Sequence, residues 1–409
     1  MFFSISKTNK DPRFCSHRHI NKYNVHLDSG WEERKVNEYT VFFKGYCDTN
    51  SLEQLLYQFI DDNTPKYSGN FCIIIISDKN LTITHDINRS FPLKYYDNDI
   101  LTNLLYNEDS VKINDNVWVD SFITYDDSGI SKTYLKNLYS IKNFEKISAI
   151  DCVDTIKTIL TNKVEQLNQI SKSVDIFLSG GIDTTMVYSL LKNKYKYPES
   201  INIIAKEEFE FSEFTVNNLE VLMNHSNLWG YKLFHHWKKS TVYATGGMGD
   251  EIFMRGPTTA AIWCAWNNIN LLGELKKIEY SYHKNYFLLE KNRKIIEFYW
   301  NNKDNLKKQF PEYTDLCSEI INMVLNDHQH WHLENTISWT PLKDMRILKT
   351  ILSLDENDIL KQIIHGSIDK EIISQLYPGM EHYICTHKNY NQYDNLRYYK
   401  PFLEKLSNA

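Results

Sequence analysis

Residues 174–185 read Val174-Asp175-Ile176-Phe177-Leu178-Ser179-Gly180-Gly181-Ile182-Asp183-Thr184-Thr185. An apolar strand pattern ends at a pair of glycines, and an acid with two hydroxyl residues follows at the start of a helix pattern. Glycines let backbone N–H groups approach a ligand closely, and a helix N-terminus adds positive dipole at the same place. The stretch therefore predicts a phosphate-binding turn between a strand and a helix, in which Asp183 holds the accompanying magnesium ion.

The spacing differs from two common nucleotide motifs. A Walker P-loop requires Gly-Lys-Ser/Thr, which does not follow here, and the Gly-x-Gly-x-x-Gly fingerprint of dinucleotide binding is also missing. The pattern Ser-Gly-Gly-x-Asp-Thr instead resembles the pyrophosphate loop of ATP pyrophosphatases, which split ATP between its α and β phosphates. An ordinary glycine-rich turn is the alternative. The residues expected at the nucleotide are Leu178, Ser179, Gly180, Gly181, Asp183, Thr184 and Thr185.

A second glycine loop occurs later in the chain and reads Tyr243-Ala244-Thr245-Gly246-Gly247-Met248-Gly249-Asp250-Glu251-Ile252-Phe253. A short strand again leads into glycines and then into acids. At the carboxyl edge of the same sheet, this loop would face the first across a crevice. The pair of loops predicts that Gly246 and Gly247 contact the nucleotide, and that Asp183 and Asp250 hold Mg²⁺ between them.

Together the two loops resemble the synthetase domain of the asparagine synthetase family. That family carries Ser-Gly-Gly-x-Asp-Ser/Thr and later Ser-Gly-x-Gly-x-Asp-Glu-x-Phe, which Thr245 to Phe253 match with substitutions. The family's Glu-Gly pair is Gly247-Met248 here, and fewer residues separate the two motifs than is usual. We therefore expect the site to admit a substrate other than aspartate.

The N-terminal part resembles that family's partner domain, a class II glutamine amidotransferase. The family ending Arg-Asp-x-x-Gly-x-x-Pro-Leu-Tyr-Tyr is similar to residues 85–96, which start at His85-Asp86 and contain Pro92-Leu93, and residues 68–71 match the turn before it. Working glutaminases use an N-terminal cysteine, exposed by removal of Met1, as the nucleophile. This chain has Phe2 there, and Cys15 is internal. Glutamine hydrolysis is therefore not expected. β-Lactam synthetases and lasso-peptide cyclases share this loss, and their amine belongs to the substrate.

The resemblance also implies two catalytic residues nearer the C-terminus. Glu334 lies upstream of Pro341-Leu342-Lys343-Asp344, which is similar to the family's Pro-Phe-Leu-Asp turn, and would accept a proton from the attacking amine. Lys388 would stabilise negative charge on the adenylate transition state. Two alternatives stay open: Glu334 as a surface acid, and Lys370 as the catalytic lysine.

Composition narrows the class of protein. The chain has 409 residues and a net charge of −6, with acids and bases interspersed, so neither a nucleic-acid nor a membrane partner is expected. Seven cysteines are scattered without a Cys-x-x-Cys pair, which favours reduced thiols in the cytoplasm. Apolar runs stay shorter than a membrane span.

Periodicity and resemblance together predict an α/β fold in two domains. Residues 1–150 are expected to form a layered antiparallel β-sheet domain of the class II amidotransferase (Ntn) type that lacks the nucleophilic cysteine. Residues 151–409 are expected to form a parallel-sheet ATP-pyrophosphatase domain with a helical C-terminal part. The individual predictions are strands at 40–46, 71–77, 81–86, 174–178 and 201–205, helices at 52–59, 153–168 and 184–194, and mostly helix from 258.

The sequence thus favours an ATP-dependent carbon–nitrogen ligase that forms AMP, with ATP and Mg²⁺ as cofactors. A substrate carboxylate would be adenylated with release of pyrophosphate, and an amine would then form an amide, for example a lactam or macrolactam in a precursor peptide. The alternatives are ammonia-dependent amidation, a non-catalytic ATP-binding regulator and a tRNA-modifying pyrophosphatase, although the chain lacks the basic face and zinc-spaced cysteines of the last. Expected partners are ATP, a substrate bearing a carboxylate and an amine, and a protease or a second copy of the chain.

Overall fold

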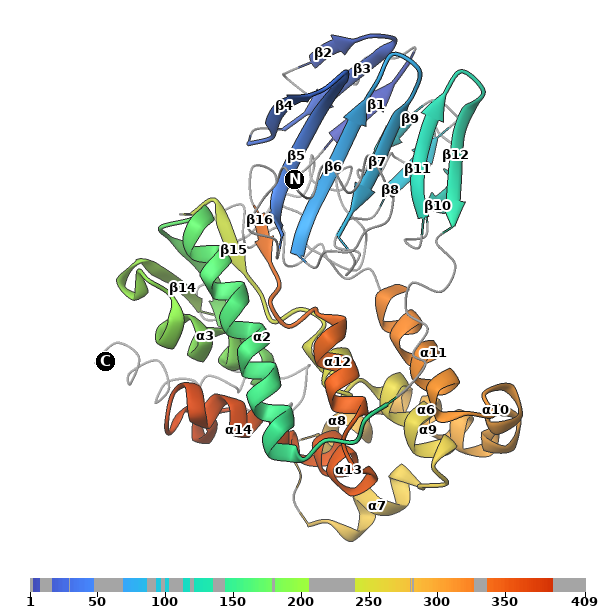
Figure 1. The fold of residues 1–409 in the computed structure, drawn as a ribbon. Helices are drawn as coiled ribbons and strands as arrows, with labels where there is room; N and C mark the ends of the chain where they lie inside the picture. Colours follow the sequence, from blue (N-terminus) through green and yellow to red (C-terminus); the bar gives the residue numbers. More distant parts are fainter. Residues whose placement is uncertain are drawn as a thin grey trace, which may run out of the picture.

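A computed structural model of the chain describes most of both halves of the protein. The fold consists of antiparallel strands at one end and a parallel sheet with helices at the other (Figure 1). The described residues are 3–7, 17–28, 30–47, 69–86, 93–96, 100–102, 113–117, 121–134, 144–178, 181–205, 240–279, 281, 283–326 and 337–384.

The described residues of the N-terminal half form two antiparallel sheets of six strands each. The first has the order β10 (Ile113–Val117), β8 (Leu93–Tyr96), β9 (Ile100–Thr102), β1 (Phe3–Ser6), β3 (Tyr23–Leu27) and β2 (His17–Ile20). The second has the order β12 (Gly129–Tyr134), β11 (Ser121–Asp126), β7 (Leu81–His85), β6 (Gly69–Ile76), β5 (Tyr39–Cys47) and β4 (Glu32–Val36).

The two sheets enclose an apolar core. Because side chains alternate between the faces of a strand, β6 sends Cys72, Ile74 and Ile76 towards β1 and β3 of the other sheet. The alternate residues Phe71 and Ile73 belong to a second buried cluster on the opposite face. The second sheet is therefore buried on both faces, as the continuous apolar run of β6 predicts.

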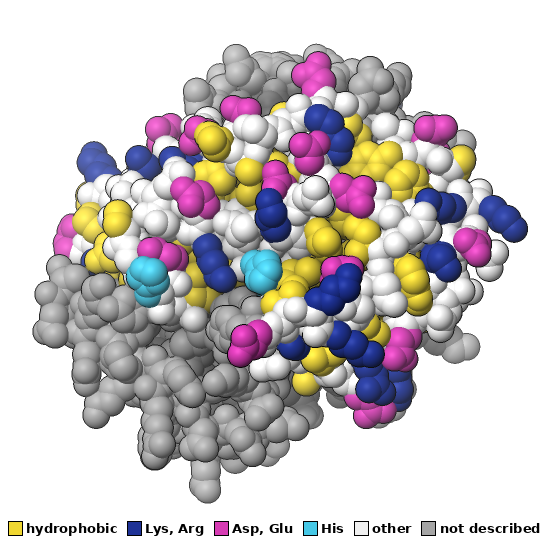
Figure 2. All heavy atoms as spheres, turned by 90° about the horizontal axis from the view of Figure 1, so that it is seen from below, with side chains coloured by type: hydrophobic (Ala, Val, Ile, Leu, Met, Phe, Trp, Pro, Cys, Tyr) yellow, Lys and Arg dark blue, Asp and Glu magenta, His cyan; other side chains and the backbone are white. Residues whose placement is uncertain are grey.

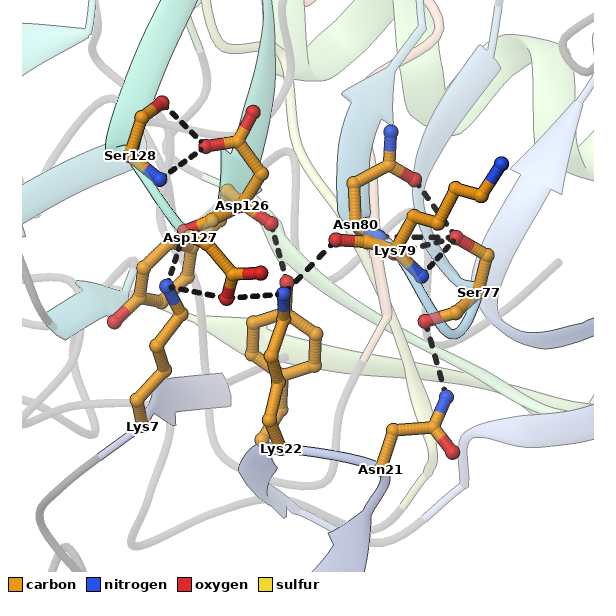
Figure 3. A network of polar contacts seen from close by, with 11 residues as sticks. Lys7, Asn21, Lys22, Ser77, Lys79, Asn80, Asp126, Asp127 and Ser128 are labelled. Atoms are coloured by element: carbon orange, nitrogen blue, oxygen red, sulfur yellow. Dashed lines mark hydrogen bonds and ion pairs between the residues drawn. The ribbon is translucent and has the colours of Figure 1, made fainter.

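Polar contacts join the turns at one end of the two sheets (Figure 3). The Lys22 ammonium, in the β2–β3 turn, donates to the Lys79 carbonyl at 3.0 Å and to the Asp127 carboxylate at 2.6 Å. Asn21 donates to the Ser77 carbonyl at 3.0 Å. These contacts hold the turns of the two sheets together at their exposed end, beyond the apolar core.

The second half contains a four-stranded parallel sheet. Its order is β14 (Ile201–Ala205), β13 (Val174–Leu178), β15 (Val242–Ala244) and β16 (Ile337–Trp339). Helix α3 (Ile182–Lys194) and the 3₁₀ turn η1 (Pro198–Ser200) connect β13 to β14, which makes a βαβ unit. Together with the antiparallel sheets, this layout confirms the fold class predicted from the sequence.

Helix α2 (Ala149–Ile170) begins at Ser148, whose hydroxyl accepts a hydrogen bond from the Asp151 N–H at 3.1 Å. Its apolar stripe lies in the main core of the second half. The other helical elements among the described residues are α5 (Gly249–Ile252), α6 (Pro257–Trp266), α7 (Leu271–Lys277), α8 (Lys284–Phe287), α9 (Glu290–Asn301), α10 (Lys303–Gln309), α11 (Tyr313–Asn326), α12 (Met345–Leu352), α13 (Glu356–His365), α14 (Ser367–Leu376) and η5 (Met380–Tyr383).

Most elements predicted from the sequence are found at or near their predicted bounds, with two differences. Gly69 and Asn70 belong to β6 rather than to the turn before it, since Gly69 pairs with Cys47 of β5. The short strand β16 interrupts the region predicted to be helical after residue 258. The predicted helix at 52–59 lies outside the described residues. The domain boundary near residue 150 stays a prediction.

The two halves meet at β16. The Asn70 side-chain amide, near the start of β6, donates to the carbonyl of Ser338. Ile337 packs against the core between the antiparallel sheets, while Tyr46 of β5 belongs to the core of the second half. The antiparallel sheets therefore lie directly against the edge strand of the parallel sheet.

A buried ion pair fastens α12 to α2. The Asp344 carboxylate lies 2.9 Å from the Lys163 ammonium, and both side chains are 1% exposed. Asp344 also accepts from the Arg346 N–H at 2.9 Å, which caps α12. Burial raises the pKa of the Asp344 carboxyl, but Lys163 and Arg346 lower it by more, so its pKa lies well below the usual range.

Replacing this acid tests the anchor. We expect Asp344→Asn to lower the free energy of unfolding by about 3–5 kcal/mol at pH 7, because Lys163 would keep a buried charge without its counter-ion. Urea denaturation measures this value. Asp154→Asn, an exposed acid on the same α2, is the control and should cost less than about 0.5 kcal/mol.

The same pair predicts a dependence on pH. The folded pKa of Asp344 is lower than the unfolded value of about 3.9, so the ionised carboxylate stabilises the fold fully above about pH 4. That contribution is lost as the pH falls through the folded pKa. Stability should therefore fall less steeply in acid for Asp344→Asn than for the wild type, and equal slopes would contradict the assignment.

Candidate functional site

The two glycine loops leave neighbouring strands at the same edge of the parallel sheet. Strand β13 pairs with β15 in parallel, with Asp175 opposite Tyr243 and Ile176 opposite Ala244. Each strand ends just before its loop, so both loops begin at the carboxyl edge. The common edge expected from the sequence is therefore present. The loops lie between β13 and β15, where the strand order reverses, and open α/β sheets bind ligands at such a point.

The first loop passes directly into α3. Leu178 is buried at the end of β13, and Gly181 stands at the N-cap of the 13-residue helix. Asp183 lies in the first turn with its side chain 20% exposed, whereas Thr185 is fully buried. The Thr184 hydroxyl donates to the Gly181 carbonyl at 3.2 Å. Ser179 and Gly180, also predicted at the nucleotide, lie outside the described residues.

The second loop packs tightly against Asp183. A Cβ on Gly246 would lie 2.7 Å from the Asp183 Cβ, 2.8 Å from its carbonyl carbon and 2.9 Å from the Thr184 nitrogen. A Cβ on Gly249 would lie 2.1 Å from the Asp183 Oδ1. Two of the three glycines are therefore required by the approach of one loop to the other. Gly247 has more space, because its nearest neighbour would be the Thr245 hydroxyl at 3.5 Å.

A fully buried arginine joins the two predicted metal ligands. Arg255 donates through Nη2 to the Asp183 Oδ1 and through Nη1 to the Asp250 Oδ1. Its Nε forms an ion pair with the Asp369 Oδ2 at 3.1 Å. The Arg255 side chain is 0% exposed, whereas Asp250 is 21% exposed. The arginine and Asp369 were not predicted from the sequence. The only local signal is a cation within an apolar run, five residues after Asp250.

Burial and charge act in opposite directions on this cluster. Burial raises the pKa of Asp183, and the nearby Asp250 and Asp369 raise it further, although Arg255 lowers it. Burial also raises the pKa of Asp369, against the opposing effect of Arg255. For the guanidinium, burial lowers the pKa, but the three carboxylates raise it by more, so Arg255 stays charged.

Helix α14 brings the rival catalytic lysine to this region. Asp369, which contacts Arg255, is followed directly by Lys370. Burial lowers the pKa of Lys370, with Asp369 acting in the opposite direction. A Cβ on Gly366 would lie 3.0 Å from the Ile182 side chain, so α14 begins beside the start of α3. Glu334 and Lys388 lie outside the described residues, and their catalytic roles stay predictions.

The described residues contain no group of three or more His, Cys, Asp or Glu side chains that could hold a metal ion by themselves. Asp183 and Asp250 would instead supply two ligands. This fits Mg²⁺, which proteins usually bind through one or two carboxylates together with substrate phosphates and water. A divalent cation bound beside Asp183 would favour the ionised form of this acid, whose pKa is raised by burial and by the two other acids.

The N-terminal half carries a separate cavity of about 200 Å³. Trp31 and Phe42 form part of its wall, and the Asp28–Lys44 ion pair lies at it with an N–O distance of 2.7 Å. Both charged side chains are nearly fully buried. Phe2 and Cys15, on which the expected loss of glutaminase activity rests, lie outside the described residues.

Positive and negative side chains are mixed on one face of the described residues. Figure 2 shows Lys and Arg side chains interspersed with Asp and Glu on the face seen from below. Among the described residues, no helix is both long and apolar enough to span a membrane.

Comparisons with known proteins found weak structural similarities without a matching sequence. No protein-family model and no curated protein matches this chain. One similar solved structure is the allosteric regulatory enzyme of purine biosynthesis, with 9% identity, a TM-score of 0.22 and coverage of 38% of this chain and 46% of that one. Another is glutamine phosphoribosylpyrophosphate amidotransferase from B. subtilis complexed with ADP and GMP, with 10% identity, a TM-score of 0.23 and coverage of 57% and 63%. The chain spans less than two thirds of either structure, and such low scores carry no functional argument.

The glycine contacts lead to a prediction about the loops. Gly246→Ala should lower the free energy of unfolding by about 1–3 kcal/mol, because the added methyl group meets backbone atoms of the first loop that cannot move aside. Gly247→Ala is the matched control and should change stability by less than about 0.5 kcal/mol. Thermal or urea unfolding measures both. Equal effects of the two substitutions would show that the loops do not approach each other in this way.

Proposed function

We propose that the chain is an AMP-forming, ATP-dependent carbon–nitrogen ligase that binds ATP where the loops after β13 and β15 meet. The observation that carries this proposal is the placement of Asp183 and Asp250. They follow two neighbouring parallel strands, form ion pairs with the same guanidinium, and have side chains that are partly exposed. This arrangement offers two hard-cation ligands beside a helix start, as a site for nucleotide phosphates requires.

The start of α3 supplies the phosphate contacts in this proposal. Its 13 residues give a helix dipole that favours negative charge at the N-terminus, and Gly181 adds no side chain there. Gly246 packs against the same turn. The nucleotide would therefore contact Leu178, Ser179, Gly180, Gly181, Asp183, Thr184, Thr185, Gly246 and Gly247.

Asp183 and Asp250 would hold Mg²⁺. When bound, the ion neutralises charge on the phosphates and so favours the departure of pyrophosphate. The three acids around Arg255 support this assignment, because one guanidinium cannot compensate all of them when they are ionised and a divalent cation could compensate the rest.

The reaction proposed has two steps. An oxygen of the substrate carboxylate attacks the α-phosphorus, the bond to the β-phosphate oxygen breaks, and pyrophosphate leaves. An amine then attacks the acyl carbon, the bond to AMP breaks, and an amide forms. Glu334 would accept the amine's proton, and Lys388 would stabilise the charge that develops on the oxygens. The amine belongs to the substrate itself, as in a lactam or macrolactam, with ammonia-dependent amidation as the alternative.

A cytoplasmic location is part of the proposal. All five cysteines among the described residues are free thiols, namely Cys47, Cys72, Cys152, Cys264 and Cys317. Burial raises the pKa of the Cys72 and Cys264 thiols, which keeps them protonated and unreactive.

A precursor peptide is the proposed substrate, with a protease or a second copy of the chain as the proposed partner.

The first test is the identity of the products. With a carboxylate substrate, ATP should yield AMP and pyrophosphate, and Asp183→Asn and Asp250→Asn should each lower the rate at least about 100-fold. Labelled ATP with a pyrophosphate-release assay measures this, and circular dichroism checks the fold. Asp154→Asn, an exposed acid on α2, is the control and should keep the wild-type rate. ADP as the nucleotide product would contradict the proposal, and ATP binding without turnover over a substrate panel would indicate a regulator.

The second test separates the two lysines. Lys388→Ala should lower kcat about 10²–10³-fold with little change in nucleotide affinity, because a cation aimed at developing charge acts mainly in the transition state. Lys370→Ala is the matched comparison. Steady-state kinetics and nucleotide titration measure the two effects. An inactive Lys370→Ala with an active Lys388→Ala would move the catalytic role to α14.

A further inference from the structure

We propose that Arg255 is a positioning residue that holds the Asp183 and Asp250 carboxylates in the arrangement a divalent cation requires. In this proposal Asp369 and Gln362 fix the guanidinium itself. The inference rests on the proposed function, because it concerns the cation site of that function. It assigns a role to a residue that neither glycine motif contains.

Burial shows that the arginine lies beneath the two acids. Arg255 is 0% exposed, whereas the Asp183 and Asp250 side chains are 20% and 21% exposed. A cation that arrives from solvent therefore meets the carboxylates and not the guanidinium. Each carboxylate accepts a hydrogen bond from Arg255 through its Oδ1. The guanidinium and a cation can thus act on the same pair of acids from opposite sides.

The planar guanidinium fixes three segments at once. Its three nitrogen atoms lie against carboxylates from the first loop, the second loop and α14. Two carboxylates this close repel each other, and a fork of fixed geometry offsets the repulsion while setting their spacing. Gly249 adds a steric limit, because the Asp183 carboxylate occupies the space that its Cβ would take.

Buried hydrogen bonds hold Asp369 and its surroundings in turn. Gln362 of α13 is fully buried and donates from Nε2 to the Asp369 Oδ2 and, at 3.0 Å, to the Phe253 carbonyl. Its Oε1 accepts from the Ile368 N–H at 2.8 Å. One uncharged side chain therefore links α13, α14 and the chain just before Arg255. Partners of this kind orient the groups that contact a metal.

The test measures cation binding rather than turnover. Mn²⁺ is titrated into the full chain with α,β-methylene-ATP, which cannot be cleaved between its α and β phosphates, and free Mn²⁺ is followed by electron paramagnetic resonance. Arg255→Lys keeps the charge but loses the three-way fork, so we expect Mn²⁺ affinity to fall at least about tenfold. Arg346→Lys, a half-exposed arginine paired with Asp344, is the matched control and should bind like the wild type.

A second variant covers the case in which Arg255→Lys does not fold. Gln362→Met removes the hydrogen bonds to Asp369 and Phe253 without changing the charge, and should weaken Mn²⁺ binding about three- to tenfold. Circular dichroism shows which variants are folded. Unchanged binding in a folded Arg255→Lys would mean that the arginine does not position the acids, and tighter binding would mean that it competes with the cation; either result would overturn the proposal. If only Gln362→Met folds, wild-type affinity would overturn it.

Asp183→Asn in the same titration separates this inference from the proposed function. If Asp183→Asn loses Mn²⁺ binding while folded Arg255→Lys keeps it, the positioning role fails and the two-loop site stands. If Asp183→Asn binds Mn²⁺ like the wild type, the cation site fails, and the proposed function fails with it.

Discussion

The parallel pairing of β13 with β15 is the constraint on which the candidate site depends. Antiparallel pairing would send the two glycine loops to opposite edges of the sheet. Parallel pairing brings both loops to one edge, where Gly246 packs against the backbone of Asp183. The acids then lie close enough to share a guanidinium, and the buried cation offsets the repulsion that this closeness creates. The parallel strand pairing, the glycines and Arg255 therefore act together to place the two carboxylates side by side.

An element of the fold could be predicted where its own sequence has a clear hydrophobic pattern. β13 and β6 are continuous apolar runs, and α2 has an apolar stripe, so local periodicity was sufficient for all three. β16 could not be recognised, because it has three residues and contains a serine. Its strand conformation comes from pairing with β15 and packing against the antiparallel sheets, which are contacts with segments distant in the sequence. Propensity gives way to tertiary context in such short elements.

Some residues of the candidate site could also be predicted from the sequence, and others could not. Asp183 and Asp250 could be predicted as neighbours, because each follows a strand and a glycine turn. Arg255 and Asp369 could not. Arg255 lies 72 residues from Asp183 and 114 from Asp369, and the three residues are brought together by contacts between distant segments of the chain. A sequence pattern can identify residues of a recurring ligand-binding turn. It does not identify a buried side chain such as Arg255, which contacts Asp183 from a distant part of the sequence.

The contact at β16 gives the N-terminal half a physical role that does not depend on glutamine chemistry. β16 is the edge strand of the parallel sheet, and an uncovered edge leaves backbone groups without partners and open to other chains. Here Asn70 donates to the Ser338 carbonyl, and Ile337 packs against the core of the antiparallel sheets. Because β16 pairs with β15, the strand that ends at the second glycine loop, these contacts also support the loop that carries Asp250. The antiparallel sheets therefore serve as a covering layer for this edge of the parallel sheet.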